Sequence, residues 1–254
     1  MTLARERRAI RQLLNEYSPA DAQAVYYAFH HPDEKTTLVP IQDDEKIVSG
    51  YVCLSRTGID LFRPLITLRL PLRSGGVDLD LSAGAELIRL AIPPGMGAII
   101  SAPAHYLPLL GGLFDINSIQ HMDLFVLDKN LYQPIINVLV SKTDSYNGLP
   151  RYVIRQSSDG QHSSRGEIVA SAGLNWRSDR FAEMYVHTKS SYRRKGMGRS
   201  VVAALVQSVL EQGQIPLYVV GEDNAPSKQL AESIGFVKSD VNEILIEGVL
   251  RVRH

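Results

Sequence analysis

The sequence has few of the features that mark extracellular or membrane proteins. Its single cysteine, Cys53, cannot form an internal disulfide, which excludes a disulfide framework within the chain. No apolar run approaches the ~18 residues that a membrane-spanning helix needs. The N-terminal stretch "MTLARERRAIRQLLNEY" carries charges where a secretion signal would need an apolar core. We therefore expect a soluble, cytoplasmic protein with no membrane partner.

The chain also lacks an excess of charge of either sign. Lysine plus arginine and aspartate plus glutamate each number 27 among 254 residues, so the formal net charge is zero. Nucleic-acid binding would therefore depend on a local basic patch. The one candidate, "RRKGMGR" from Arg193 to Arg199, has no interleaved aromatic residues. We expect no nucleic-acid partner.

Hydrophobic patterns and turn residues predict two domains with a similar order of elements. The polar, turn-rich stretch "SKTDSYNGLP" predicts a linker at 141–150 between domains 1–140 and 151–254. In the first domain we expect the order α-α-β-β-β-α-β-α-β, and in the second β-β-β-α-β-α-β. The fold class is α/β of the α+β type. Each domain should have a mixed, mostly antiparallel sheet, flanking helices and a central parallel βαβ unit.

A basic, glycine-containing turn opens the helix that begins near 197. The start of a helix has unpaired N–H groups and a partial positive charge, and Gly196 and Gly198 let the backbone approach an anion closely. "GMGRSV" lacks the third glycine of the dinucleotide fingerprint, and the chain has no Gly-x-x-x-x-Gly-Lys-Ser/Thr motif. This pattern favours a diphosphate without a nucleotide-triphosphate site.

Three stretches together resemble the acyl-CoA core of the GNAT superfamily of N-acetyltransferases: "FAEMYVHTKSSYRRKGMGRSVVAAL", "IPLYVV" and "EDNAPSKQLAESIGF". The resemblance covers Gly166 to Phe236. It implies acetyl-CoA as co-substrate and no metal, with the pyrophosphate on the turn and the pantetheine arm between two parallel strands. The implied coenzyme contacts are Val186, His187, Thr188, Arg193, Arg194, Lys195, Gly196, Met197, Gly198, Arg199, Ser200, Asn224 and Ser227.

The resemblance extends to the first domain through its element order, which implies tandem GNAT-like domains. The corresponding turn reads "LRSGGVDLDL", without Arg-x-x-Gly-x-Gly and with Asp78 and Asp80 close by. Aspartates would repel a pyrophosphate at short range. We expect a degenerate copy without coenzyme, whose role is structural or which forms one wall of the acceptor site.

Acetyl transfer to an amine needs a neutral amine, a held thioester and stabilisation of the developing oxyanion. The resemblance implies that Glu183 is the general base and that the N–H near Val186 is the oxyanion donor. The alternative for Glu183 is a solvated or ion-paired strand residue without a catalytic role. Many family members have a tyrosine that protonates the leaving thiolate where this chain has Ala231. Tyr192 and Tyr218 are the candidate replacements, and water is a further alternative because a thiol has a pKa of ~8.5.

The resulting hypothesis is an N-acetyltransferase that moves an acetyl group from acetyl-CoA to a primary amine of a small molecule or peptide. An alternative is a non-catalytic acyl-CoA-binding regulatory or scaffolding protein, and a third is another phosphate ligand at the same turn. Neither the acceptor nor the oligomeric state can be predicted from the sequence.

Two other groups of residues have simpler interpretations. His30 and His31, with Asp33 and Glu34, lack the helical spacing of metal ligands and are interpreted as a solvated helix end. Cys53 and Trp176 are interpreted as packing residues, although Trp176 is also a candidate for the acceptor pocket.

Overall fold

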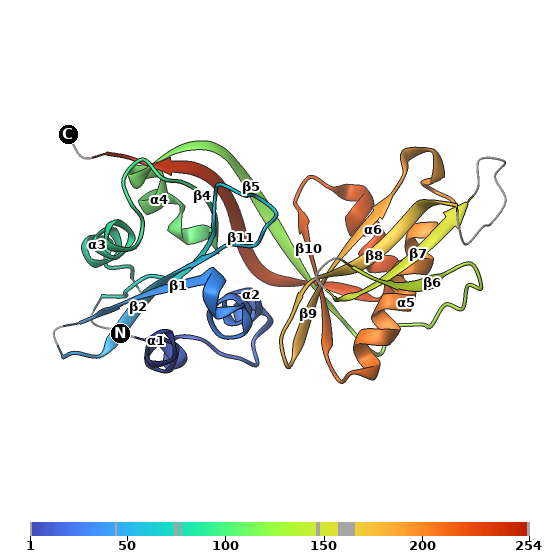
Figure 1. Cartoon of the computed structure of the whole chain (residues 1–254), viewed down its shortest axis with the longest axis horizontal. Coiled ribbons are helices and arrows are strands. Elements are labelled where there is room, and N and C mark those ends of the chain that lie inside the picture. Colours follow the sequence, from blue (N-terminus) through green and yellow to red (C-terminus); the bar gives the residue numbers. More distant parts are fainter. Residues whose placement is uncertain are drawn as a thin grey trace. The chain divides into compact units, whose positions relative to one another are not determined.

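The chain divides into two compact units (Figure 1). The computed structural model describes residues 2–43, 45–73, 76, 78–145, 148–156 and 166–252. The first unit comprises Met1–Met122 and Val241–His254, and the second comprises Asp123–Asp240. No helix in these described ranges is long and apolar enough to span a membrane.

These units differ from the predicted division at 141–150. Strands β5 (Phe114–Leu127) and β11 (Phe236–Leu250) each contribute residues to both units. The later part of β11 belongs to the first unit because it pairs antiparallel with β4, with Ile246 opposite Ile100. Within the expected linker, Ser141–Asp144 form strand β6, while residues 146 and 147 lie outside the described residues.

The first unit has an α+β arrangement. Its strands follow the order β1-β2-β3-β4-β11-β5, antiparallel between β1, β2 and β3 and parallel between β3 and β4. Its remaining elements are α1 (Leu3–Ile10), η1 (Arg11–Leu13), η2 (Pro19–Asp21), α2 (Ala22–Val25), η3 (Tyr26–His30), η4 (Asp33–Lys35), β1 (Thr36–Gln42), β2 (Val48–Ser55), β3 (Leu65–Arg69), α3 (Leu81–Ala91), β4 (Gly97–Pro103), η5 (Ala104–Tyr106) and α4 (Leu107–Leu113).

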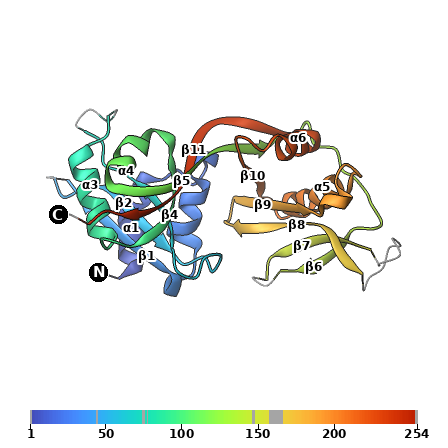
Figure 2. The same ribbon diagram turned by 90° about the horizontal axis from the view of Figure 1, so that it is seen from above.

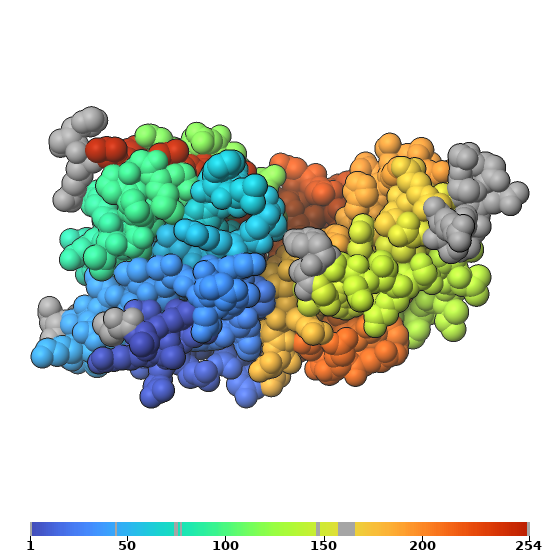
Figure 3. Space-filling model, viewed as in Figure 1, coloured from blue at the N-terminus to red at the C-terminus, as the bar shows by residue number. Residues whose placement is uncertain are grey.

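The second unit repeats this plan. Its strand order is β5-β10-β9-β8-β7-β6, antiparallel from β6 to β9 and parallel between β9 and β10. Its elements are β6 (Ser141–Asp144), β7 (Pro150–Gln156), β8 (Glu167–Arg177), β9 (Phe181–Thr188), η6 (Ser190–Tyr192), α5 (Met197–Glu211), β10 (Ile215–Gly221) and α6 (Ala225–Ile234). Figure 3 shows the yellow-green segment that contains β6 at the surface of this unit.

Local sequence signals explain where several helices begin and end. The Ser18 hydroxyl accepts the N–H of Ala20 at the start of η2, and Pro19 occupies the first position of that helix. Asn224 caps α6 by accepting the N–H of Ser227, and Gly235 ends that helix in the left-handed conformation. The residue types at these positions therefore account for the helix ends.

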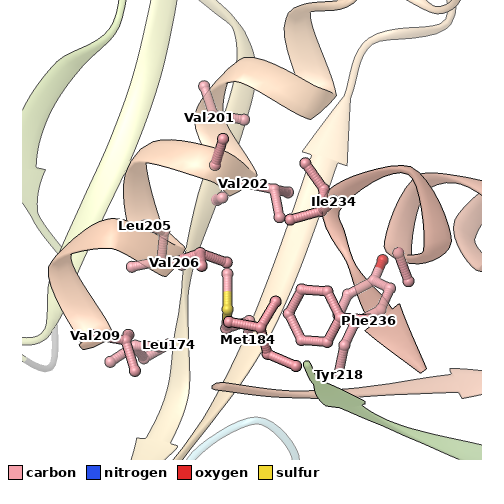
Figure 4. Close-up of a cluster of buried hydrophobic side chains, with 14 of the residues drawn as sticks. Leu174, Met184, Val201, Val202, Leu205, Val206, Val209, Tyr218, Ile234 and Phe236 are labelled. Carbon is pink, nitrogen blue, oxygen red and sulfur yellow. The ribbon is translucent and has the colours of Figure 1, made fainter. Parts of the chain in front are cut away.

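The core of the second unit lies between α5 and the sheet. The apolar stripe of α5, including Val202, Leu205 and Val206, faces Met184 of β9 and Tyr218 of β10 (Figure 4). Figure 2 shows α5 and α6 on the same side of these strands. Burial of this stripe holds the first turn of α5 against the carboxyl ends of β9 and β10.

An ionic cluster fixes α6 within the second unit. The Asp123 carboxylate on β5 is buried and lies 2.5 Å from the Lys228 ammonium on α6 and 2.7 Å from that of Lys238 on β11. Burial alone would raise the pKa of Asp123, but hydrogen bonds from both lysines bring it below its usual value. The carboxylate therefore remains ionised where it joins three elements.

Candidate functional site

Strands β9 and β10 pair over their first halves and then part. Their parallel register runs from Phe181 opposite Ile215 to Met184 opposite Tyr218 and ends there, although β9 continues to Thr188 and β10 to Gly221. The carboxyl end of a parallel pair is where ligands of α/β sheets bind. The two strands therefore enclose a gap that opens beyond Met184.

The backbone of β9 turns hydrogen-bonding groups into this gap. The N–H of Lys189 donates to the carbonyl of Val169 in β8. Because N–H directions alternate along a strand, the N–H of His187 also points toward β8, while those of Val186 and Thr188 point toward β10. Those amides face the part of the gap where the β10 register has ended.

The turn before α5 exposes further backbone donors. Arg194 and Gly196 both have positive φ angles, of 59° and 75°, which is unusual for a residue with a side chain such as Arg194. Gly196 is the N-cap of α5, and no side chain of the described residues caps the helix there. Open space surrounds the Gly196 Cα, since an added Cβ would meet no atom within 4 Å. The first amides of α5 are thus accessible to an anion.

A pocket of about 840 Å³ lies over this turn, the end of β9 and the start of α6. Its lining includes three arginines and, among the described residues, no carboxylate. Such a volume suits a small-molecule ligand, and the charge favours an anion. The lining residues are Val186, His187, Thr188, Tyr192, Arg193, Arg194, Gly196, Met197, Gly198, Arg199, Asn224, Pro226, Ser227, Gln229 and Leu230.

Glu183 stands just before the point where β9 and β10 part. It pairs with Leu217, and the next pair, Met184 with Tyr218, is the last. Its side chain is buried, and burial raises the pKa of its carboxyl, while hydrogen bonds from Asn175 and Trp176 oppose that rise. Glu183 therefore lies at the closed end of the gap, roughly 10 Å along the strand from Val186.

Comparisons with known proteins agree with this arrangement. Residues 165–245 match the family model described as "FR47-like protein". A tandem GNAT protein from the clavulanic acid biosynthesis pathway superimposes with a TM-score of 0.59 at 12% identity, covering 100% of this chain and 96% of that one. The chain therefore has the GNAT fold.

Two further GNAT structures are similar to this chain. A GCN5-related N-acetyltransferase-like protein from Streptococcus suis has a TM-score of 0.59 at 12% identity, covering 96% of this chain and 99% of that one. A GCN5-related N-acetyltransferase from Kribbella flavida has a TM-score of 0.58 at 17% identity, with coverages of 91% and 93%. No curated protein matches the sequence significantly.

The first unit also has a parallel pair of strands followed by a helix, but there its own side chains bond to the backbone N–H groups that are open in the second unit. The β3–β4 register ends at Thr67 opposite Ser101, and the N–H of Leu70, beyond it, donates to the buried Tyr106 hydroxyl at 3.2 Å. The Asp80 carboxylate caps α3 by accepting two backbone N–H groups at 3.0 Å. An internal carboxylate thus occupies the helix start that the second unit leaves open. Residues 74, 75 and 77 of the expected turn lie outside the described residues.

Most of the predicted coenzyme residues of the second GNAT unit line the pocket, and two do not. The Lys195 ammonium lies over the ring of Tyr192, 5.0 Å from its centroid. Ser200 is buried, where its hydroxyl donates to the Gly196 carbonyl and accepts from Asn137. Both residues therefore hold the turn together rather than line its cavity.

Sequence reasoning missed three lining residues and one partner of Glu183. Pro226, Gln229 and Leu230 share the first two turns of α6 with the predicted Asn224 and Ser227. Helical spacing from the Asn224 cap could have identified them. Asn175 had no such signal, because it reaches Glu183 through a strand irregularity that the sequence does not reveal.

The interpretation of the histidine pair as a solvated helix end holds for His30, Asp33 and Glu34, which are exposed, and is wrong for His31. His31 is buried, its Nδ1 is 2.9 Å from the Thr36 hydroxyl, and its ring packs near Tyr26 and Tyr27. Burial, with the nearby Lys35, lowers the pKa of His31. Within the described ranges, no group of histidine, cysteine and acidic residues is arranged to hold a metal. Cys53 is buried in the core, as predicted, and burial raises its pKa to about 11.

Proposed function

We propose that the second GNAT unit binds acetyl-CoA and transfers its acetyl group to a primary amine. The observation that carries this proposal is the pocket that joins the open start of α5 to the end of β9, beyond the point where its pairing with β10 stops. The pyrophosphate would accept hydrogen bonds from the amides of Met197, Gly198 and Arg199, and the arginines would neutralise its charge. The pantetheine chain would then follow β9 toward Glu183.

The residues near the closed end of the gap suit the chemistry of transfer. The amine nitrogen attacks the thioester carbonyl, and the N–H of Val186 would stabilise the developing oxyanion. A C–N bond forms, the C–S bond breaks, and coenzyme A leaves as a thiolate. Glu183, directly or through water, would take the proton that the amine loses.

Tyr218 is better placed than Tyr192 to return a proton to the thiolate. Tyr218 is the last β10 residue in register with β9, and its hydroxyl hydrogen-bonds to Ser227 on α6. Ala231, where many family members have tyrosine, is one helical turn further along α6. Burial raises the pKa of Tyr218, which favours the protonated form that can donate.

Tyr192 lies at the other end of the site. It lines the pocket beside the basic turn, where Lys195 covers its ring. A role in holding the turn or contacting the phosphate end of the coenzyme suits this position better than proton donation to sulfur.

We expect one coenzyme per chain. In the first GNAT unit, Asp80 and Tyr106 already satisfy the backbone groups that a coenzyme would need. Repulsion from the Asp80 carboxylate adds to this loss of donors.

The test is acceptor-dependent release of coenzyme A thiol, measured with acetyl-CoA and a panel of small amines and peptides. Turnover with any amine supports the proposal. The acetylated product should gain ~42 Da, because an acetyl group replaces one hydrogen of the amine. Tight binding of acetyl-CoA without turnover across the panel would instead support the non-catalytic alternative.

A further inference from the structure

Both oxygens of the Glu183 carboxylate accept a hydrogen bond from neighbouring residues on β8. The Asn175 side-chain amide donates to Oε1 at 2.7 Å, and the Trp176 indole N–H donates to Oε2 at 2.6 Å. Such short bonds are typical of a charged acceptor. Two donors from adjacent residues fix both the position and the rotation of the carboxylate.

A β-bulge makes this double contact achievable. The β8–β9 register passes from Leu174 opposite Met184 directly to Trp176 opposite Glu183, so Asn175 is the extra residue. In a regular strand, consecutive side chains point to opposite faces, and Asn175 and Trp176 would not share a partner. The bulge redirects one of them, a use of bulges that recurs beside active sites.

The two donors differ in exposure, which makes the two carboxylate oxygens unequal. Trp176 is 2% exposed and Glu183 is 7% exposed, whereas Asn175 is exposed to solvent. Oε2 therefore has its partner in the interior, and Oε1 has its partner at the surface. Of the two oxygens, Oε1 is therefore the one whose hydrogen-bond partner is in contact with solvent.

Among the described residues, no charged group contributes to the pKa shift of this carboxyl. Burial raises its pKa, and the only opposing causes are the hydrogen bonds from Asn175 and Trp176. Its direct neighbours across the sheet are Trp176 on β8 and Leu217 on β10. The titratable or charged residues on these strands and their hairpin turn are Glu167, Arg177, Asp179, Arg180, Tyr185, His187 and Tyr218.

We propose that Asn175 and Trp176 are positioning residues for Glu183, with Trp176 anchoring Oε2 inside the unit and Asn175 orienting Oε1 as the oxygen that receives the acceptor's proton. This inference rests on the proposed function, because it takes Glu183 as the base. It goes further by naming the side chains that orient the base and the oxygen that acts.

The chain contains a built-in probe of this arrangement. Trp176 is its single tryptophan, so the indole N–H gives one signal in a ¹H–¹⁵N NMR spectrum. We expect that signal to lie downfield and to shift with pH as Glu183 gains a proton. Glu183→Gln should abolish the titration, and Asn175→Leu should move its midpoint to higher pH, since losing a donor favours the protonated acid. His187→Gln should leave the titration unchanged.

Kinetics distinguish positioning from a structural role. Asn175→Leu and Trp176→Phe should each lower kcat about tenfold or more, because each removes one hydrogen bond to a charged group. The KM for acetyl-CoA should stay unchanged. The rising limb of the kcat/KM pH profile should move to higher pH. Arg177→Gln is the matched control, because Arg177 bonds to Gln212 instead.

The outcomes separate this inference from the proposed function. Reduced thermal stability of both variants with an unchanged kcat and pH profile would overturn the positioning role. An indole signal that does not respond to Glu183→Gln would overturn the hydrogen-bond arrangement itself. Absence of turnover in the wild type, with the indole titration intact, would overturn the proposed function while leaving the arrangement established.

Discussion

Replacing Gly196 by alanine separates the backbone strain of the turn from its contact with the coenzyme. Gly196 and Gly213 have the same φ of 75°, one at the start of α5 and one just beyond its end. At each position an added Cβ meets no atom within 4 Å. Alanine at either site should therefore lower the free energy of unfolding by about 1 kcal/mol, the cost of a left-handed conformation.

The coenzyme distinguishes the two variants, because only Gly196 lies in the pocket. At a concentration 100 times its Kd, acetyl-CoA should stabilise the wild type by about 2.7 kcal/mol. The methyl group of Gly196→Ala occupies space on the approach to the α5 amides. A tenfold loss of affinity would reduce the stabilisation to about 1.4 kcal/mol, while Gly213→Ala should retain the full value.

The assay is urea unfolding with and without acetyl-CoA, followed by the fluorescence of Trp176, which reports on the second unit. Equal stabilisation of the two variants by acetyl-CoA would refute the placement of the pyrophosphate at this turn. Unequal stability in the absence of coenzyme would refute the reasoning about strain.

Three further predictions address other parts of the chain. In steady-state kinetics, Tyr218→Phe should lower kcat about tenfold or more, while Tyr192→Phe should mainly raise the KM for acetyl-CoA. The reverse result would assign proton donation to Tyr192 instead of Tyr218. Asp80→Ala should lower the free energy of unfolding by about 1 kcal/mol through loss of the α3 cap, as measured by denaturation. The variant should still bind one coenzyme per chain, as measured by the binding stoichiometry. Asp123→Asn should cost about 2 kcal/mol at pH 7 by leaving its two lysine partners unpaired. Because the pKa of Asp123 is lowered in the folded state, the wild type should lose this advantage as pH falls below ~4. Urea unfolding should therefore show a clear difference in stability between the two proteins at pH 7 and a smaller difference at pH 3.

The sequence predicted local structure well where the chemistry was local. Strands Thr36–Gln42 and Gly97–Pro103 coincide with the stretches "TTLVPIQ" and "GAIISAP", because residues that favour strands lie there between clear breaks. The Asn224 cap and the Gly235 stop were equally readable. The division into units was not, because it depends on which strands β5 and β11 pair with, and pairing partners far apart in sequence leave no local signal.

The same distinction holds for the site. The glycines and arginines of the turn were identified because an anion site at a helix start needs those residue types in sequence. The double hydrogen bond to Glu183 depends on a bulge that changes the register between β8 and β9. The occupied gap of the first unit depends on Tyr106, which lies 36 positions from its partner, Leu70.

The most direct test of the account is a calorimetric titration of the whole chain with acetyl-CoA. We expect saturable binding at one site per chain, with affinity that weakens as salt screens the arginines of the turn. Absence of saturable binding would contradict the central claim, because the open start of α5 and the gap between β9 and β10 would then not serve the coenzyme.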